Sequence, residues 1–500
     1  MPSPPTPRPS LGAKAAITVG LVVIADQLFY GHEPGLNLGL FGLVLSAVAL
    51  AAFSALRRDR RGLSAVGVAA CMALLLLERP TVAITALLLV ALGVATLSPR
   101  APRDHDAWLW TQRLIIGGTR CLLSPLTDLR RLHARRGTRG SHRPCLAKLS
   151  TLILPLVGGL AFLALFSAAN PVIEANLAAI RLPRLDLARG LLWLVAAATL
   201  WGFLRPRGPR RALAPPDGRG DLRVFGVTPA SLTLSLVVFN ALFALQNGLD
   251  VAFLWSDAPL PAGVTLAQYA HRGAYLLIAT AILAGVFVLI ALRPGSTTTS
   301  RPMVRWLVVA FVAQNLLLVA SSALRTVDYV EAYGLTRLRI SALVWMGLVA
   351  VGLILICVRL LRDKSSSWLI NANVLAAAAM LLATSVIDLG AVAADWNTRN
   401  ARDIDSQGPP LDLGYLRGLG GAALVPLTRL EGRLPPAPQR EALTAARLEL
   451  TADLARQQAD WRTWSWRDQR RLDKARGLAA RLPSPIQAPA PLTDASQPGT

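Results

Sequence analysis

Carboxylates, guanidiniums and one histidine recur in the second half of a strongly apolar chain, where a lipid environment makes such groups costly. The candidate functional cluster contains Asn240, Asn247, Asp250, His271, Arg272, Asp328, Glu331, Arg337 and Arg339. Asn240, Asn247 and Asp250 share one face of a helix, because they are spaced by seven and three residues. Polar side chains within membrane helices usually face the bundle interior. The cluster therefore predicts a charged site for a small polar ligand or a proton.

The same residues also have a purely structural interpretation. Carboxylates pair with arginines at a membrane surface, and intramembrane amides hold helices together. Further polar residues of this kind are Asp26, Asn371, Asn373 and Asp388. Asp250, His271 and Glu331 could supply metal ligands, but their spacing matches no standard pattern, and no metal site is predicted.

Catalytic templates are missing from the sequence. It contains no P-loop, no GxSxG elbow, no HExxH and no glycine-rich dinucleotide turn. Catalytic residues and a cofactor are therefore not assigned. The four cysteines imply neither a disulfide framework nor a CxxC metal site.

Composition places most of the chain in lipid. Of 500 residues, 53% are hydrophobic and only 16% are charged, and the mean hydropathy is +0.46. The formal charge of +23 comes from short basic clusters between apolar runs. That arrangement is typical of cytoplasmic loops and argues against a nucleic-acid-binding surface.

Eleven apolar runs are long enough to cross a bilayer core of about 30 Å. They cover residues 12–30, 36–56, 63–77, 81–97, 149–169, 188–204, 228–249, 273–292, 306–324, 340–361 and 368–389. The predicted fold class is all-α, a polytopic transmembrane bundle of about eleven helices with a small helical extramembrane C-terminal tail. Because only Glu78, Arg79 and Pro80 separate the short third and fourth runs, these form either two crossings or a re-entrant hairpin. The flanking basic loops favour two crossings.

The runs divide the chain into five parts. These are a four-helix membrane segment (1–98), a basic cytoplasmic loop (99–148), a seven-helix membrane region (149–390), a soluble helical tail (391–482) and a disordered C-terminus (483–500). Of the 52 Lys and Arg residues, 29 fall in the N-terminal arm and alternate loops, and only eight in the opposite loops. Since basic loops stay inside, we expect a cytoplasmic (inner) membrane protein with its N-terminus in the cytoplasm and its tail extracytoplasmic.

The basic loop contains an apolar stretch at 108–123, on which Arg113 and Arg120 share one helical stripe. This pattern predicts an interfacial helix on the inner leaflet. The arginines from Arg113 to Arg143 could contact anionic lipid. The plainer alternative is a loop that only sets topology.

The tail carries an apolar pattern of its own. Its members are Leu443, Leu450, Leu454, Trp461 and Trp464, spaced by seven, four, seven and three residues. The spacing predicts that residues 438–481 form mostly one helix with this face buried. Residues 411–430 could supply the surface it packs on, forming a helical cap.

Several strings carry a family resemblance. They are FNALFALQNGLDVAFLW at 239–255, YAHRGAY at 269–275, LRTVDYVEAYGLTRLR at 324–339, WLINANVLA at 368–376 and LDLGYLRGLG at 411–420. In these strings the chain resembles bacterial polytopic membrane proteins that are grouped only as a domain of unknown function. The resemblance implies a multi-pass fold and no mechanism.

Two functional hypotheses follow. The first is a non-enzymatic protein that transports or senses a small ligand through the outer polar cluster; a transporter is expected to have helices broken at mid-membrane. The second is an enzyme of lipid or envelope-glycan transfer, in which Glu331 or Asp328 acts as a base beside phosphate-binding arginines. A deep groove for a lipid tail would favour the second. The lipid bilayer is the predicted partner, nucleic acid is not, and protein partners are unassigned.

Overall fold

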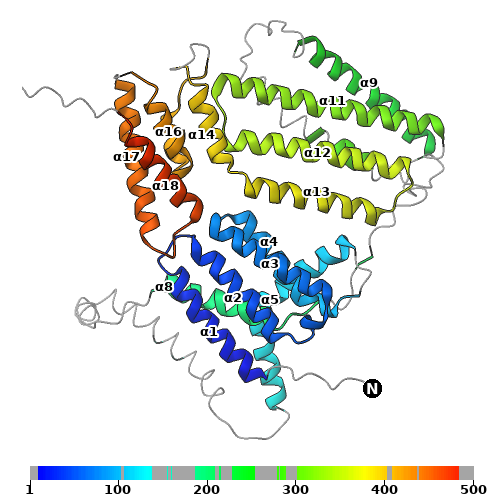
Figure 1. Ribbon diagram of the computed structural model, residues 1–500. Coiled ribbons are helices and arrows are strands. Elements are labelled where there is room, and N and C mark those ends of the chain that lie inside the picture. The colour runs from blue at the N-terminus through cyan, green and yellow to red at the C-terminus, as the bar shows by residue number, and fades with distance from the viewer. Residues whose placement is uncertain are drawn as a thin grey trace, which may run out of the picture.

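The computed structural model is helical throughout the part of the chain that it describes (Figure 1). The described residues are 10–102, 106–137, 186–208, 213–214, 228–253, 282–288, 301–402, 408–435 and 438–482, with a few isolated positions. The predicted crossings at 149–169 and 273–292 lie wholly or mostly outside them, and so does the predicted disordered C-terminus.

The first four helices form an antiparallel group near the N-terminus. They are α1 (Leu11–Phe29), α2 (Leu36–Ala52), α3 (Arg60–Glu78) and α4 (Val82–Leu97), with short 3-10 turns η1 (Leu56–Arg58) and η2 (Ser98–Arg100). Ser10, Asp59 and Thr81 cap three of these helices, because each side chain accepts a hydrogen bond from the first turn. The lengths of α3 and α4 fit the two crossings expected for 63–97.

Two further helices join this first group. Helix α5 (Ala107–Gly137) packs on α4 and on α8 (Leu187–Phe203), and α8 packs on α1. The predicted division at residue 148 placed α8 with the later membrane helices. In the structure it packs with the N-terminal group, because Arg189 and Trp193 of α8 bind a carboxylate on α1.

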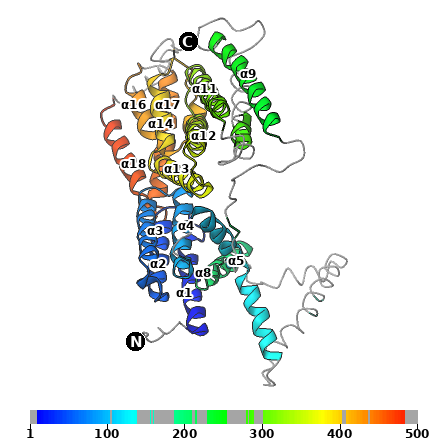
Figure 2. The ribbon, with the colours of Figure 1, turned by 90° about the vertical axis from the view of Figure 1, so that its right-hand side faces the viewer.

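The second group contains α9 (Pro229–Phe253), α11 (Pro302–Tyr333), α12 (Arg337–Leu361) and α13 (Ser366–Val386). Figures 1 and 2 show α11, α12 and α13 side by side, with α1 to α4 forming a separate group below them. A cluster of buried apolar residues around Phe311, Val308 and Met346 joins α9, α11 and α12.

Seven described helices are long and apolar enough to cross a membrane: α1, α3, α4, α9, α11, α12 and α13. Helices α2 and α8 are apolar but have only 17 residues each. The chain is therefore a multi-pass, all-α membrane protein.

The tail is a helical cap at one end of both groups (Figure 1). It consists of α14 (Leu389–Arg399), α15 (Leu413–Gly418), α16 (Gly421–Glu431), α17 (Pro438–Ala459) and α18 (Trp466–Ala479). Its own core gathers Leu416, Leu424, Leu443, Leu454 and Leu472. The predicted packing of 411–430 against the later tail helix is present.

The prediction of one helix over 438–481 is wrong. The chain turns at residues 460–465, between α17 and α18. Asp460 accepts from the amide of Arg462, and Ser465 caps α18 by accepting from Asp468. Ser465 and Asp468 form a capping pair at the start of α18. The pair is visible in the sequence, but the apolar spacing alone does not indicate that a new helix begins there. Trp461 is half exposed as a result, whereas Leu443 and Leu454 are buried.

Candidate functional site

The α9 members of the predicted cluster lie in a polar seam between α9 and α11. Asn240 accepts a hydrogen bond from Gln314 (2.7 Å), and Asn247 donates to the carbonyl of Gln314 (3.1 Å). Asp250 pairs with Arg325, and both side chains are almost completely buried. An ion pair at this depth is tolerated because each charge neutralises the other.

The seam has acceptor oxygens that no described residue satisfies. They are Asp250 Oδ2, Asn247 Oδ1, Gln314 Oε1 and Asn315 Oδ1. Buried polar atoms are normally hydrogen-bonded, so water or further parts of the protein are expected at this seam. In the described part of the chain, no three His, Cys, Asp or Glu side chains gather as metal ligands.

The remaining cluster residues do not share that seam. Arg339 donates to the carbonyl of Tyr333 (3.1 Å), and its guanidinium carbon lies 4.3 Å from the centroid of the Tyr329 ring. Arg337 contacts the cap, where its amide donates to the Tyr415 hydroxyl (2.8 Å). Glu331 is exposed, and Asp328 is half-buried.

His271 and Arg272 lie outside the described residues. The gathering of all nine predicted residues in one site therefore stays a prediction.

A second charged site, absent from the predicted cluster, joins the cap to both helix groups. Arg79, in the α3–α4 connection, lies 3.1 Å from Asp388 at the start of α14. Arg471 of α18 pairs with the same carboxylate. Arg467 and Arg470 of α18 lie 3.1 and 3.0 Å from Glu78. We call these residues, together with Asp468 and Arg337, the cap junction.

Attraction between opposite charges stabilises the cap junction. Burial alone raises the pKa of Asp388, but Arg471 and Arg79 outweigh it and hold that pKa below its ordinary value. Burial lowers the pKa of Arg79, Asp388 raises it, and Arg467, Arg471 and Arg337 lower it further. An arginine remains protonated despite such a shift, so the junction keeps its positive charges.

The sequence carried a signal for this junction. In the sequence, Glu78 and Arg79 separate two apolar runs, and no pattern assigns a partner to Asp388. Arg467, Arg470 and Arg471 fall on one face of α18 because they are three and four residues apart. A basic helical face in the tail, opposite a charged interhelical loop, indicates docking.

Backbone contacts also fix the cap. The amide of Leu36 donates to the carbonyl of Trp464 (2.8 Å), and that of Asn37 to Arg462 (3.1 Å). These amides belong to the first turn of α2, where Gly35 supplies no side-chain cap. The turn at 460–465 thus caps α2 from the other end of the chain.

The structure gives Asp26 the partner that the sequence did not identify. Its carboxylate accepts from Arg189 at 2.6 Å and from the Trp193 indole at 2.8 Å. Asp26 is buried, whereas the Arg189 side chain is 41% exposed. The pair fastens α1 to α8.

In the predicted interfacial helix, the first arginines have protein contacts. Arg113 is buried, and Arg120 donates to the carbonyl of Gly208 (2.6 Å). The side chains from Arg130 to Arg143 lie outside the described part. Contact of this segment with anionic lipid stays a prediction.

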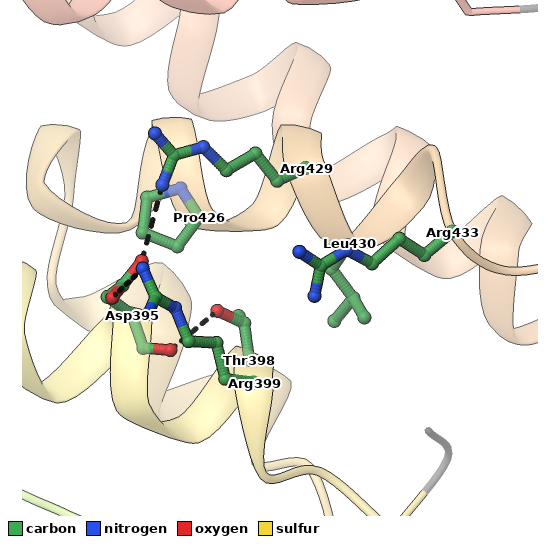
Figure 3. A pocket seen from close by; sticks show the side chains of 7 residues that line it. All are labelled: Asp395, Thr398, Arg399, Pro426, Arg429, Leu430 and Arg433. Atoms are coloured by element: carbon green, nitrogen blue, oxygen red, sulfur yellow. Dashed lines mark hydrogen bonds and ion pairs between the residues drawn. The ribbon is translucent and has the colours of Figure 1, made fainter. Parts of the chain in front are cut away.

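Three cavities accompany the cap. One, of about 570 Å³, opens between α4, α12 and α13 beside the cap junction, and Arg79 and Arg337 line it. A second, of about 510 Å³, lies between the α1–α2 connection and α17. The third, of about 230 Å³, lies within the cap itself. Figure 3 shows Asp395 between Arg399 and Arg429, at 2.8 and 3.3 Å, with the Arg433 guanidinium turned toward the same space. Three guanidiniums around one carboxylate leave an excess of positive charge that suits a small anion.

Residues 40–430 match the family model described as "Domain of unknown function (DUF4153)". The chain belongs to this family. The DUF4153 region spans α2 to α16, so the cap junction lies partly within it and partly in α18. No curated protein matches the chain, and no solved structure does.

Proposed function

We propose that this DUF4153 protein senses a small anionic ligand on the extracytoplasmic side of the cytoplasmic membrane, with its N-terminus in the cytoplasm. The observation that carries the proposal is the cap junction. A single extramembrane unit contacts the α3–α4 connection and the α13–α14 connection through partly buried ion pairs. A ligand that shifts the cap would therefore act on both helix groups.

The helix connections that contact the cap support its position on one side of the membrane. His32 after α1, Arg79 after α3 and Asp388 after α13 all contact the cap, as alternate crossings require. At the other end, Asp106 accepts from Ser367 (2.6 Å), so the chain after α4 lies beside the start of α13. Together with the positive-inside bias, this arrangement supports an extracytoplasmic cap.

Sensing is favoured over transport by helix continuity. Among the described helices that could cross a membrane, α9, α11, α12 and α13 run unbroken. Transporters commonly bind their substrate at helices broken near the midplane. The cap cavity of Figure 3 is the candidate ligand site, because Arg399 of α14, Arg429 of α16 and Arg433, just after α16, line it.

The experiment uses the full chain in spheroplasts and inside-out vesicles, with trypsin added from outside. We expect cleavage within the cap only in spheroplasts, and slower cleavage when inorganic phosphate, sulfate or citrate is bound. An Arg433→Gln variant should lose that protection, whereas Arg456→Gln, on the exposed face of α17, should keep it. Cleavage of the cap only in inside-out vesicles would reject the proposal. A cleavage rate that is the same with and without each of the three anions would also reject it.

A further inference from the structure

The cavity between α4, α12 and α13 has two chemically different parts. Its apolar part is lined by Val344, Trp345, Leu348, Ala377, Met380 and Leu381. Its polar part is lined by Arg79, Thr81, Arg337, Ser341, Thr384 and Ser385. The volume of about 570 Å³ is in the range of roughly 300 to 1,000 Å³ that is typical of small-molecule sites.

Helix register orders these two parts along the membrane direction. Arg337 begins α12, and Leu348 lies on the same helix about 16 Å farther in, at 1.5 Å per residue. On α13, Ser385 lies at the cap end and Ala377 two turns deeper. The cavity is therefore charged beside the cap and apolar toward the interior of the bilayer.

The charged end has more cations than anions. Arg79, Arg337, Arg467, Arg470 and Arg471 meet Glu78, Asp388 and Asp468, which leaves two positive charges in excess. No carboxylate among the described residues lies within ion-pair distance of Arg337. Its guanidinium instead packs against Gly390, where any added Cβ would overlap it.

We propose that this cavity binds one anionic phospholipid of the surrounding bilayer. The phosphate contacts Arg337 and Arg79, and one acyl chain lies along Val344, Leu348 and Ala377. A guanidinium is suited to phosphate because its donors match the phosphate oxygens. The proposal goes beyond the proposed sensing role, because the lipid would bind whether or not the cap responds to a soluble ligand.

The lining supports binding rather than catalysis. None of the described lining residues is a carboxylic acid, a histidine or a cysteine. The hydroxyls of Ser341, Thr384 and Ser385 each donate to a carbonyl of their own helix. The cavity thus holds cations and apolar surface, without a base to activate a nucleophile.

The test counts bound lipid on the purified full chain by native mass spectrometry. Phosphatidylglycerol and phosphatidylcholine with identical acyl chains are titrated separately. We expect phosphatidylglycerol to bind at least about tenfold more tightly, and Arg337→Gln to remove that preference. Arg456→Gln, which removes the same charge from the exposed cap surface, should keep it. Equal affinity of both lipids, or an unchanged preference in Arg337→Gln, would overturn the proposal.

A second pair of variants leaves the cap junction untouched. Ala377→Trp fills the apolar part of the cavity, whereas Ala379→Trp adds the same bulk on the opposite face of α13. We expect only Ala377→Trp to reduce phosphatidylglycerol binding, by about tenfold. Equal binding by the two variants would mean that no acyl chain enters the cavity. Displacement by excess glycerol 3-phosphate would likewise show that a soluble phosphate suffices, and would reject the lipid.

Discussion

Arg79 Nη2 lies 3.1 Å from Asp388 Oδ1, although the two residues belong to opposite halves of the chain. Arg79 follows α3 in the first helix group, and Asp388 precedes α14 at the end of the second. Arg471 of the cap binds the same carboxylate. One carboxylate thus links the two helix groups and the cap, which makes Asp388 the most informative residue to change.

Asp388→Asn should destabilise the docked cap by about 2 kcal/mol. Removing one member of a fully buried pair costs about 3 to 5 kcal/mol, but the two arginines here retain some contact with solvent. The population of undocked cap should rise about 30-fold. This is measurable as faster trypsin cleavage at the arginines of α17 and α18. Asp453→Asn, which breaks an exposed pair on α17, should change the rate little. Equal rates for Asp388→Asn and the parent would remove Asp388 from the docking interface.

The same carboxylate should make docking sensitive to acid. Its pKa is lower in the folded chain than its ordinary value of 3.8, so the unfolded chain takes up the proton first as the pH falls. The stabilisation is therefore complete well above pH 3.8 and is lost below it. The thermal midpoints of the parent and of Asp388→Asn, measured from neutral pH to about pH 3, should converge at the acid end. A gap that widens with acid would contradict the sign of the pKa shift.

The helices were predictable from sequence because lipid imposes a simple requirement. A run of about 20 apolar residues must form a helix to satisfy its backbone groups. The predicted runs at 12–30 and 340–361 correspond to α1 and α12 within a few residues. The run at 306–324 underestimates α11, which reaches Tyr333, because helix geometry continues past the apolar window.

The site was less predictable, because partners of charged residues are chosen by packing. Asp250 pairs with Arg325, a partner that the sequence pattern did not assign to it. Helical periodicity places Asp250 on a face of α9 but cannot select which residue of α11 faces it. The basic face of α18 indicates docking of the tail, but no local pattern selects Glu78 and Asp388 as its partners.

Gly35→Ala should undock the turn at 460–465. An added Cβ would overlap the backbone of Thr463, and the hydrogen bonds from the amides of Leu36 and Asn37 would be lost. Two buried hydrogen bonds are together worth about 2 kcal/mol. Gly67→Ala, where nothing lies within 4 Å of the new Cβ, is the matched control. Hydrogen exchange at the first turn of α2 should accelerate in Gly35→Ala alone, and equal protection in both variants would contradict the contact.

Asp26 and Arg189 should show measurable coupling. Asp26→Asn leaves a guanidinium without its carboxylate, and Arg189→Gln leaves a buried carboxylate. Since Arg189 is partly exposed, we expect a small coupling free energy, different from zero, in a double-mutant cycle. The readout is the thermal midpoint of the purified protein. Strictly additive effects of the two substitutions would show that the pair does not fasten α1 to α8.

Asp250→Asn and Glu331→Gln should differ strongly, although both residues belong to the predicted cluster. Asp250 is buried against Arg325, and neutralising it removes the carboxylate that balances the charge of this buried guanidinium. We expect a loss of about 3 kcal/mol and a clear fall in folded protein. Glu331 is exposed at the end of α11, so Glu331→Gln should alter stability by about 0.5 kcal/mol or less. Folded yield from solubilised membranes, followed by gel filtration, distinguishes the two.

If Glu331→Gln unfolds the protein as Asp250→Asn does, Glu331 must bind a structural partner outside the described residues. If Glu331→Gln leaves the folded yield intact yet abolishes the rescue of a deletion phenotype, Glu331 acts in function rather than in folding.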